Sequence, residues 1–362
     1  MQNVQAVQKL PHVRAQFVLG HPLGLGRFGP EKAEGIIRLS SIIVLIVNLV
    51  WVGTLSAADK LRIGYSGATV SNAMLWVTDE GKLFQKNGID PQILYLQTTL
   101  GQTAMIAGEI DICVYSGSLL ASARLQGADV VMVVSFLNRP LYRLVVRPEI
   151  KTVADLKGKR LGITRFGTVT DSMTRLLVGK LGLDPERDVA YVQVGDVPIL
   201  LASLSSGKII DGAIIQPPYY LKAVATGMHV LVNMQEMDLA VQQTGLNTTQ
   251  KFIAKNPDVV RRAVKSVIEG IHLMRNNPAL AKRALSKRMQ IKDEKELEDT
   301  YQLLKSFVQP KPYPTLEGFK TIFDDLSKRV AAAKSANAKD YVDMRFIEEL
   351  DKSGYIDAMY RQ

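Results

Sequence analysis

The residues whose types and spacing could do chemistry lie in the stretch 160–177, which reads RLGITRFGTVTDSMTRLL. Four residues separate Gly162 from Gly167, which is the spacing of the two glycines in a phosphate-binding P-loop. A P-loop also requires Lys and then Ser or Thr directly after its second glycine, but Thr168 and Val169 follow Gly167 here. The stretch therefore argues against a nucleotide-binding P-loop, and it does not contain the dinucleotide pattern G-x-G-x-x-G.

The same stretch has a more general interpretation as an apolar strand, a glycine turn and the start of a helix. The first N–H groups of a helix have no partner within the helix, so they point beyond the strand end and can bind a small ligand or an anion. The alternative is an ordinary strand-to-helix turn that binds nothing.

Length and composition favour a protein of two domains with a large apolar core. The chain has 362 residues, 47% of them hydrophobic, and its formal net charge is +10. The densest basic run, 261–288, has helical spacing and few aromatic residues, which is typical of a solvated helix face. The charge pattern therefore does not indicate a nucleic-acid-binding protein.

The N-terminal region reads as an export signal. Arg38 precedes an apolar block, 42–52, that is too short to span a bilayer comfortably, and the small residues Ser56, Ala57 and Ala58 follow it. We expect a signal peptide that ends near Ala58 and a mature, periplasmic protein. Retention of the segment as an uncleaved membrane anchor is the alternative.

Residues that could hold a metal or form a disulfide are few. Cys113 is the one cysteine of the chain and stands in an apolar run, so it reads as a buried hydrophobic residue. After the signal, His229 and His272 remain, and neither has a partner at metal-ligand spacing. We predict no metal site.

The chain after residue 58 contains an internal repeat. Both halves follow the same order of strand, Gly/Ser/Thr turn, helix, Asp-Pro turn, strand, helix, Gly-x-Ile-(Ile)-Asp turn, strand, helix and strand. The matching segments are 61–76 with 160–177, 87–96 with 181–194, and 103–133 with 199–232. Alternation of strands and helices predicts two α/β lobes with mainly parallel sheets.

In open α/β sheets the ligand sits beyond the carboxyl ends of the strands. If the two lobes face each other, four such ends line one cleft. They are Ser66 and Gly67; Ser116, Gly117 and Ser118; the turn from Arg165 through Gly167 to Thr168; and Gln216 with Pro217. Asn138 and Tyr142 lie near the connection between the lobes and could also reach the cleft.

The remaining sequence divides the chain into three parts. Residues 1–58 form the N-terminal extension and signal, 59–146 plus 236–362 the first lobe, and 147–235 the second lobe. The first lobe is discontinuous because helical segments after Asn256, including 294–307 and 315–329, are expected to pack back on it. Residues 144–146 read as a strand before the second lobe.

The sequence resembles the ABC-transporter solute-binding proteins for nitrate, taurine and alkanesulfonates and their relatives for thiamine-pyrimidine precursors. The resemblance covers nearly the whole chain after the signal. It rests on the segments AMLWVTDEGKLFQKNGID, AGEIDICVYSGS, LQGADVVMV, VADLKGKRLGITRFGT, LGLDPERDV, SGKIIDGAIIQPP, NPDVVRRAV, PYPTLEGF and VDMRFIEELDKSG.

The resemblance implies a type II periplasmic-binding-protein fold that clamps a solute by hinge closure. It implies a monomer without a cofactor that captures a small anionic or polar solute and delivers it to an ABC permease. The family's ligand contacts fall at the strand-to-helix turns named above, and Arg165 is the charged residue that could pair with a carboxylate or sulfonate.

Two other functions stay open. One is an enzyme on the same fold. An enzyme similar to a thiamine-pyrimidine synthase would need a cysteine-rich cluster and an active-site histidine, which the single cysteine and the positions of His229 and His272 do not supply. An enzyme similar to a chorismate dehydratase could use Ser116 or Asp171, but no acid/base pair is suggested by their spacing. A ligand-sensing module would need an output domain or the retained anchor.

Overall fold

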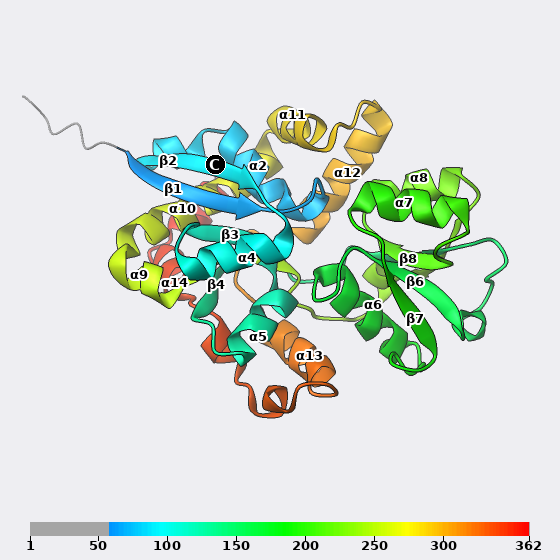
Figure 1. Ribbon diagram of the computed structural model, residues 1–362. Helices are drawn as coiled ribbons and strands as arrows, with labels where there is room; N and C mark the ends of the chain where they lie inside the picture. The colour runs from blue at the N-terminus through cyan, green and yellow to red at the C-terminus, as the bar shows by residue number, and fades with distance from the viewer. Residues whose placement is uncertain (1–57, 362) are drawn as a thin grey trace, which may run out of the picture. The chain divides into compact units, whose positions relative to one another are not determined.

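The structure is a computed structural model that describes residues 58–361. Within this range the chain forms one compact unit. The signal-peptide prediction falls on residues outside the described range. Ten strands of the described part form two five-stranded sheets flanked by helices, as the repeat predicts (Figure 1).

The first lobe is built on a sheet with the strand order β2-β1-β3-β10-β4. Its strands are β1 (Asp59–Tyr65), β2 (Ile89–Tyr95), β3 (Ile112–Ser116), β4 (Val130–Leu137) and β10 (Thr244–Thr249). β1 pairs in parallel with β2 and β3, whereas β10 is antiparallel to both β3 and β4. Four strands therefore run in one direction, and their carboxyl ends meet at one edge.

The second lobe repeats this topology with the order β7-β6-β8-β5-β9. Its strands are β5 (Arg143–Val146), β6 (Lys159–Ile163), β7 (Val189–Gln193), β8 (Gly212–Ile215) and β9 (His229–Asn233). β5 is the antiparallel member here. Each lobe thus receives its antiparallel strand just after the chain has crossed from the other lobe. β5 includes the strand expected at 144–146, which the sequence division placed at the end of the first lobe.

Helices connect the parallel strands in both lobes. In the first lobe they are η1 (Val70–Asn72), α2 (Ala73–Glu80), α3 (Leu83–Lys86), α4 (Thr98–Ala107) and α5 (Gly117–Leu125). In the second lobe they are η2 (Ala154–Leu156), α6 (Val169–Lys180), α7 (Val197–Ser206), α8 (Tyr219–Ala225) and η3 (Met234–Glu236).

The C-terminal third is helical. Its elements are α9 (Gln250–Lys255), α10 (Pro257–Asn276), α11 (Pro278–Met289), α12 (Glu294–Phe307), α13 (Leu316–Leu326), η4 (Ala331–Ser335), η5 (Ala338–Tyr341), α14 (Arg345–Lys352) and α15 (Tyr355–Met359). The apolar stripe of α10 is fully buried in the same cluster as the first sheet and α2, with Val260, Val264, Val267 and Ile271 at 0% exposure. Burial of this stripe stabilises the helix.

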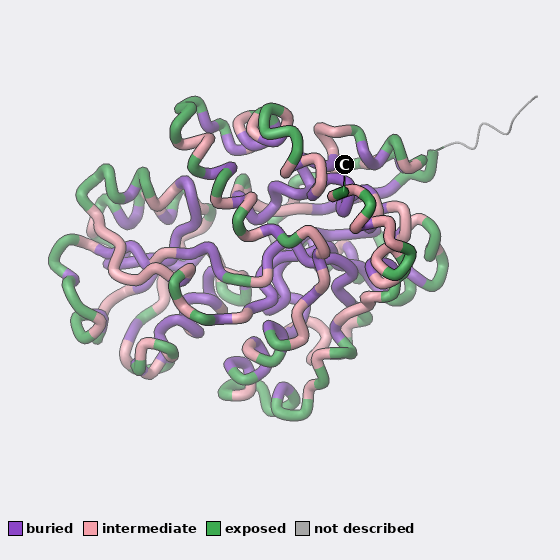
Figure 2. Tube along the Cα trace, turned by 180° about the vertical axis from the view of Figure 1, so that it is seen from behind, coloured by how far each residue is buried: buried purple, intermediate pink, exposed green. Residues whose placement is uncertain are grey.

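The apolar core lies on both faces of the first sheet and continues toward the second lobe. In β3, Ile112 and Val114 belong to the cluster with α2 and α10, whereas Cys113 and Tyr115 belong to a second cluster. This second cluster also contains side chains of α5, α6 and α13, so it joins the two lobes behind the cleft. Figure 2 shows the buried chain running through both sheets, with exposed segments outside.

One ion pair is repeated in both lobes and fixes the Gly-x-Ile-(Ile)-Asp turns. Asp111 accepts hydrogen bonds from the backbone N–H and the guanidinium of Arg62, on β1. Asp211 accepts the equivalent bonds from Arg160, on β6. The aspartate of each turn therefore ties the strand that follows it to the neighbouring parallel strand, β1 in the first lobe and β6 in the second.

We predict that the Asp211 pair makes stability depend on pH. Hydrogen bonds from Arg160 hold the pKa of Asp211 below its ordinary value of 3.8. The contribution is therefore present above about pH 4 and is lost as the pH falls through the lower pKa of the folded state. Urea unfolding between about pH 6 and pH 3 should show a shallower pH dependence for Asp211→Asn. Asp238→Asn, at an exposed position, should keep the wild-type dependence.

Candidate functional site

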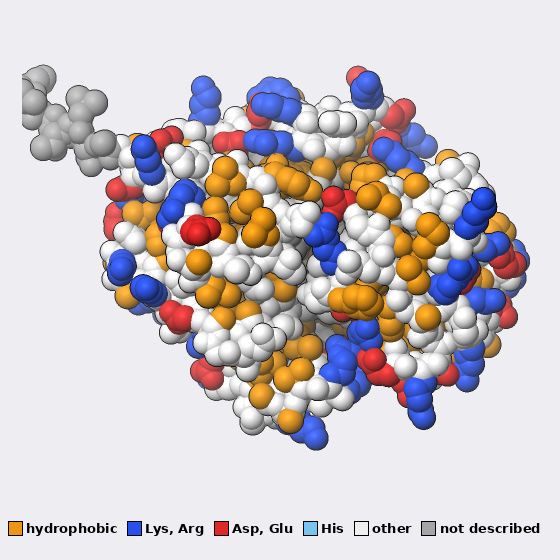
Figure 3. Space-filling model, in the orientation of Figure 1, with side chains coloured by type: hydrophobic (Ala, Val, Ile, Leu, Met, Phe, Trp, Pro, Cys, Tyr) orange, Lys and Arg blue, Asp and Glu red, His pale blue; other side chains and the backbone are white. Residues whose placement is uncertain are grey.

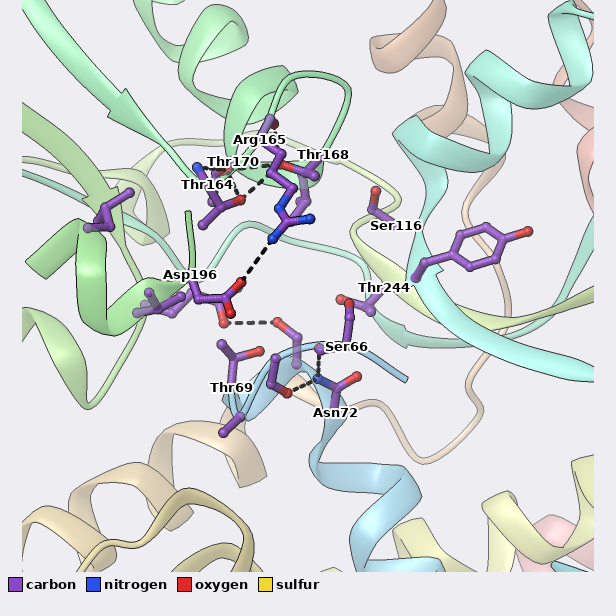
Figure 4. A pocket seen from close by; sticks show the side chains of 18 of the residues that line it. Ser66, Thr69, Asn72, Ser116, Thr164, Arg165, Thr168, Thr170, Asp196 and Thr244 are labelled. Atoms are coloured by element: carbon purple, nitrogen blue, oxygen red, sulfur yellow. Dashed lines mark hydrogen bonds and ion pairs between the residues drawn. The ribbon is translucent and has the colours of Figure 1, made fainter. Parts of the chain in front are cut away.

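A cavity of about 340 Å³ lies between the two lobes, at the carboxyl ends of their parallel strands. Its polar lining includes Ser66, Thr69, Ser71, Asn72, Gln97, Ser116, Thr164, Arg165, Thr168, Thr170, Asp196, Gln216 and Thr244. Figure 4 shows side chains from both lobes pointing toward one another across it. The volume is at the lower end of the range for small-molecule sites, which is about 300–1,000 Å³.

The structure brings seven of the residues predicted from the sequence together at this cavity. They are Ser66, Gly67, Ser116, Tyr142, Arg165, Thr168 and Gln216. Five others lie outside its lining. They are Gly117, Ser118, Asn138, Gly167 and Pro217.

Local contacts explain where some of these five residues lie. Gly117 packs against the backbone of Gln242, and the amide of Asn138 donates to the carbonyl oxygen of Tyr313. Gly167 has a φ of +77° in the turn before α6, which glycine adopts more readily than other residues. Ser118 lies beside a small pocket between α5, α6 and α13.

Sequence reasoning missed several lining residues. Thr164 and Thr170 stand in the stretch that was singled out, but the prediction stopped at Thr168. Asp196 is the N-cap of α7, and Pro198 lies two residues later in its first turn. An aspartate just before a proline in the first turn was a usable signal for a helix start. Thr244 opens the returning strand β10, and the spacing of the sequence does not reveal its position at the cavity.

Three threonines of the second lobe form a hydrogen-bonded triad. The hydroxyl of Thr164 lies 3.1 Å from that of Thr168 and 2.8 Å from that of Thr170. The Thr168 and Thr170 hydroxyls are 3.0 Å apart. Thr168 donates to the carbonyl oxygen of Arg165 at 2.7 Å, and Thr170 accepts from the backbone N–H of Thr164 at 2.9 Å. The turn between β6 and α6, within the stretch 160–177, is thus fixed by its own side chains.

Asp171 holds this turn from the other side. One carboxylate oxygen accepts from the backbone N–H of Gly167 at 2.9 Å, and the other accepts from Arg175 at 2.7 Å. Arg175 also bonds Glu186 and lies over the Tyr191 ring. Asp171 therefore has a positioning role here and is not among the residues that line the cavity.

Arg165 contacts protein groups on both sides of the cavity. Its guanidinium donates to the side-chain oxygen of Gln97, in the first lobe, and lies 4.0 Å from the carboxylate of Asp196. The Arg165 side chain is 29% exposed and that of Asp196 is 59% exposed. The cation thus lies at the rim of the cavity.

Further hydrogen bonds join the lobes across the cavity. Ser71 donates to the side-chain oxygen of Gln216 at 2.9 Å, and both residues are buried. The Tyr219 hydroxyl donates to the carbonyl oxygen of Ala68 at 2.9 Å. These contacts connect segments about 150 residues apart, as the sequence separations of 145 and 151 show. The structure is therefore a closed arrangement of the two lobes.

Four further lining residues carry hydroxyl groups and are almost fully buried. Tyr115, Tyr142, Ser116 and Thr244 are each less than 10% exposed. Burial raises the pKa of the Tyr115 and Tyr142 hydroxyls above their ordinary value, so both rings are neutral. The Ser116 oxygen accepts from the backbone N–H of Leu119, which makes Ser116 the N-cap of α5.

Within residues 58–361, no set of three or more His, Cys, Asp or Glu side chains is placed to hold a metal ion. No helix in the same range is long and apolar enough to cross a membrane. His229 and His272 are not among the residues that line the cavity.

Comparison with known proteins places this geometry in context. A family model described as "NMT1/THI5 like" matches residues 69–281. A protein of Brucella abortus (strain 2308) whose name says only that it is a binding protein is 24% identical over 246 residues, 66% of this chain and 75% of the relative. The riboflavin-binding protein RibY of Chloroflexus aurantiacus is 25% identical over 166 residues, 45% of this chain and 46% of RibY.

The fold itself is similar to that of solved binding proteins. The periplasmic aliphatic sulphonate binding protein SsuA from Escherichia coli aligns with a TM-score of 0.62 and 19% identity. The alignment covers 78% of this chain and 97% of SsuA. This likeness establishes the two-lobed periplasmic-binding-protein fold that the sequence predicts.

Proposed function

The chain belongs to the NMT1/THI5-like family, and from this premise we propose that it is the solute-binding component of an ABC importer. It captures one small solute in the cavity between its lobes and delivers it to a membrane permease. The solute is polar, and the sequence alone left anionic and neutral solutes open. The protein works outside the cytoplasm, performs no chemistry and needs no cofactor.

The observation that carries this proposal is the cavity closed by hydrogen bonds between the lobes. Ser71 with Gln216 and Tyr219 with Ala68 can form only when the two lobes approach each other. Closure of this kind removes a solute from water and is the hinge motion used by two-lobed binding proteins. That the relatives include binding proteins for riboflavin and sulphonate also supports capture of a small molecule.

Exposed apolar side chains support a protein partner such as a permease. Tyr95 and Leu100 in the first lobe and Phe166 and Ile199 in the second are each more than half exposed. Hydrophobic side chains gather on both lobes in the view of Figure 3. Exposed apolar patches rimmed by polar residues are typical of protein–protein contact sites. A permease that touches both lobes would respond to their closure.

The enzyme alternative finds less support in the geometry. Asp171 is paired with Arg175 and Gly167, and Ser116 caps α5, so neither is placed as part of an acid/base pair. A sensing module remains the other alternative, and it would use the same cavity.

The proposal is tested by thermal unfolding of the protein against a panel of solutes. The panel holds taurine, longer alkanesulfonates, nitrate, bicarbonate, aromatic carboxylates and pyrimidine precursors. A solute at about 100 times its Kd should add ~2.7 kcal/mol of stability, which raises the Tm by a few degrees. Recovery of the solute unchanged and a stoichiometry of one per chain by calorimetry are expected. Consumption of the solute would favour the enzyme, and two sites per chain would contradict the single cavity.

Loss of cavity hydroxyls should weaken binding. In Thr168→Ala the triad loses a member that is only 4% exposed, and we expect the Kd to rise about tenfold, equivalent to ~1.4 kcal/mol. Ser116→Ala should also weaken binding, and loss of its N-cap should cost ~1 kcal/mol of stability. Calorimetry with the solute found above measures both. Wild-type affinity in both variants would remove these residues from the site.

A further inference from the structure

Resting on the proposed function, we infer that the solute is uncharged and presents hydrogen-bond donors, such as hydroxyl or amino groups, to the wall of the second lobe. The polar atoms that line the cavity carry this inference, because many of their hydrogens are already committed within the protein. An oxoanion such as nitrate or a sulfonate is therefore a poor match for this wall.

The first step is the charge of the cavity wall. Among the described residues, Arg165 and Asp196 are the charged side chains that line the cavity, and their formal charges cancel. Arg165 is already bonded to Gln97 and faces the Asp196 carboxylate at 4.0 Å. A buried ion without a partner of opposite charge loses its hydration without compensation. The wall thus offers no net positive charge to an anion.

The second step follows the hydrogens of the threonine triad. A hydroxyl has one hydrogen and two lone pairs. The Thr168 hydrogen must point at the carbonyl oxygen of Arg165, because a carbonyl can only accept. The three contacts within the triad must then be made with the two remaining hydroxyl hydrogens, those of Thr164 and Thr170. The triad therefore keeps lone pairs for a solute but has no spare hydrogen to donate to one.

The third step concerns donors elsewhere on the wall. Both amide hydrogens of Asn72 are used, since this nitrogen donates to the carbonyl oxygens of Ser66 and Gly67 at 2.7 and 2.9 Å. The Ser71 hydroxyl is committed to Gln216 and the Tyr219 hydroxyl to Ala68. The side-chain oxygen of Asn72 and the carboxylate of Asp196 remain as acceptors.

The fourth step is the N-terminus of α6, where an anion would otherwise be favoured. Asp171 lies in the first turn of this helix and accepts the hydrogen bond of the Gly167 N–H. The chain's own carboxylate therefore already supplies negative charge at this helix end. The Tyr115 hydroxyl does not serve a solute as a donor, because its oxygen is buried beside Gln102, which is not among the lining residues.

The class that fits is thus a neutral molecule that presents hydrogen-bond donors to the wall of the second lobe. A polyol and an amino-substituted heteroaromatic ring both meet this description. The four tyrosines among the lining residues, Tyr95, Tyr115, Tyr142 and Tyr219, add flat apolar surface for the rest of the molecule.

The experiment begins with capture from a polar metabolite extract. The purified protein is incubated with the extract, desalted and denatured, and the released solute is identified by mass spectrometry and by its electrophoretic mobility. The captured solute is then titrated calorimetrically at low and high NaCl, with and without excess sodium methanesulfonate. An uncharged solute whose Kd changes less than about threefold with salt, and which methanesulfonate does not displace, is expected.

Variants test the wall itself. Thr170→Val removes a lone-pair acceptor with little change of shape and should raise the Kd about tenfold. Thr174→Val is the matched control, because its hydroxyl donates to the carbonyl oxygen of Thr170 on the same helix but the residue does not line the cavity. Asp196→Asn should also weaken binding about tenfold. Arg165→Gln should weaken binding less than either, with Arg187→Gln on the exposed surface as its control.

The outcomes separate the inference from the function on which it rests. Capture of an anionic solute, displacement by methanesulfonate, or a loss of more than about a hundredfold in Arg165→Gln would overturn the inference and leave the binding function standing. Retention of no solute at all would count against the binding function itself.

Discussion

Replacing Asp171 by Asn is expected to destabilise the protein by about 2–3 kcal/mol and to weaken solute binding at least about tenfold. Asp171 uses one oxygen for the N–H of Gly167 and the other for the guanidinium of Arg175. Asparagine has one oxygen and one NH₂ group, so it must turn a donor toward one of these two donors. The turn that carries Thr168, or the pairing of Arg175, is then lost.

The surroundings of Asp171 make this loss costly. The side chains of Asp171 and Arg175 are each only 12% exposed. Arg175 continues to Glu186, which also accepts from Arg329 near the end of α13. One chain of ion pairs therefore runs from the cavity turn to a helix of the C-terminal third. Urea unfolding measures the stability, and calorimetry measures the affinity.

Glu186→Gln is the matched control for this prediction. Glu186 bonds the same Arg175, but its side chain is 50% exposed and does not touch the turn before α6. We expect a stability loss of at most ~1 kcal/mol and an unchanged Kd. If Asp171→Asn bound the solute as well as Glu186→Gln does, the turn would not depend on Asp171.

The sequence was sufficient to predict the repeated architecture, because local sequence patterns marked each strand and helix. The two Gly-x-Ile-(Ile)-Asp turns predicted equivalent strands, and the structure shows the same strand order in both lobes. The burial of the α10 stripe followed from its 3.6-residue period. The pairing of Asp111 with Arg62, and of Asp211 with Arg160, was not predicted, since each aspartate is about 50 residues from its arginine.

The site was only partly predictable, because hydrogen bonding between distant segments decides which turn residues face the cavity. Ser116, Thr168 and Gln216, which were predicted from strand ends, line the cavity. Gly117 carried the same signal, yet it contacts Gln242 on the segment that returns to the first lobe. A glycine after a strand can serve a ligand or a close backbone contact, and the sequence does not distinguish the two.

Arg165 shows the same limit for charge. An arginine at a strand end predicted an anchor for an anionic solute, but its position beside Asp196 and Gln97 depends on elements of both lobes. The residue type of Arg165 alone favoured an anionic solute. What the guanidinium can bind depends on its hydrogen-bond and charge partners, which the sequence does not show.

The last prediction concerns the segment around Gln242, which lies between β9 of the second lobe and β10 of the first. Gln242 is fully buried between Gly117 of α5 and Gly318 of α13. A Cβ atom on Gly117 would lie 2.6 Å from the Gln242 carbonyl oxygen, and one on Gly318 would lie 2.4 Å from the Gln242 nitrogen. Both contacts are with backbone, so the segment must move. We expect Gly117→Ala and Gly318→Ala each to cost about 2–3 kcal/mol in urea unfolding.

Gly179→Ala is the matched control, because Gly179 lies inside α6 and a Cβ there would approach only the end of Lys328, at 3.5 Å. It should stabilise the protein by ~0.5–1 kcal/mol. Since both damaging changes act on the same residue, the double variant should cost less than the sum of the two single changes. Full additivity would show that the two glycines act independently of Gln242. Gly117→Ala should also weaken solute binding, because the segment it displaces adjoins Ser116 and Thr244 at the cavity.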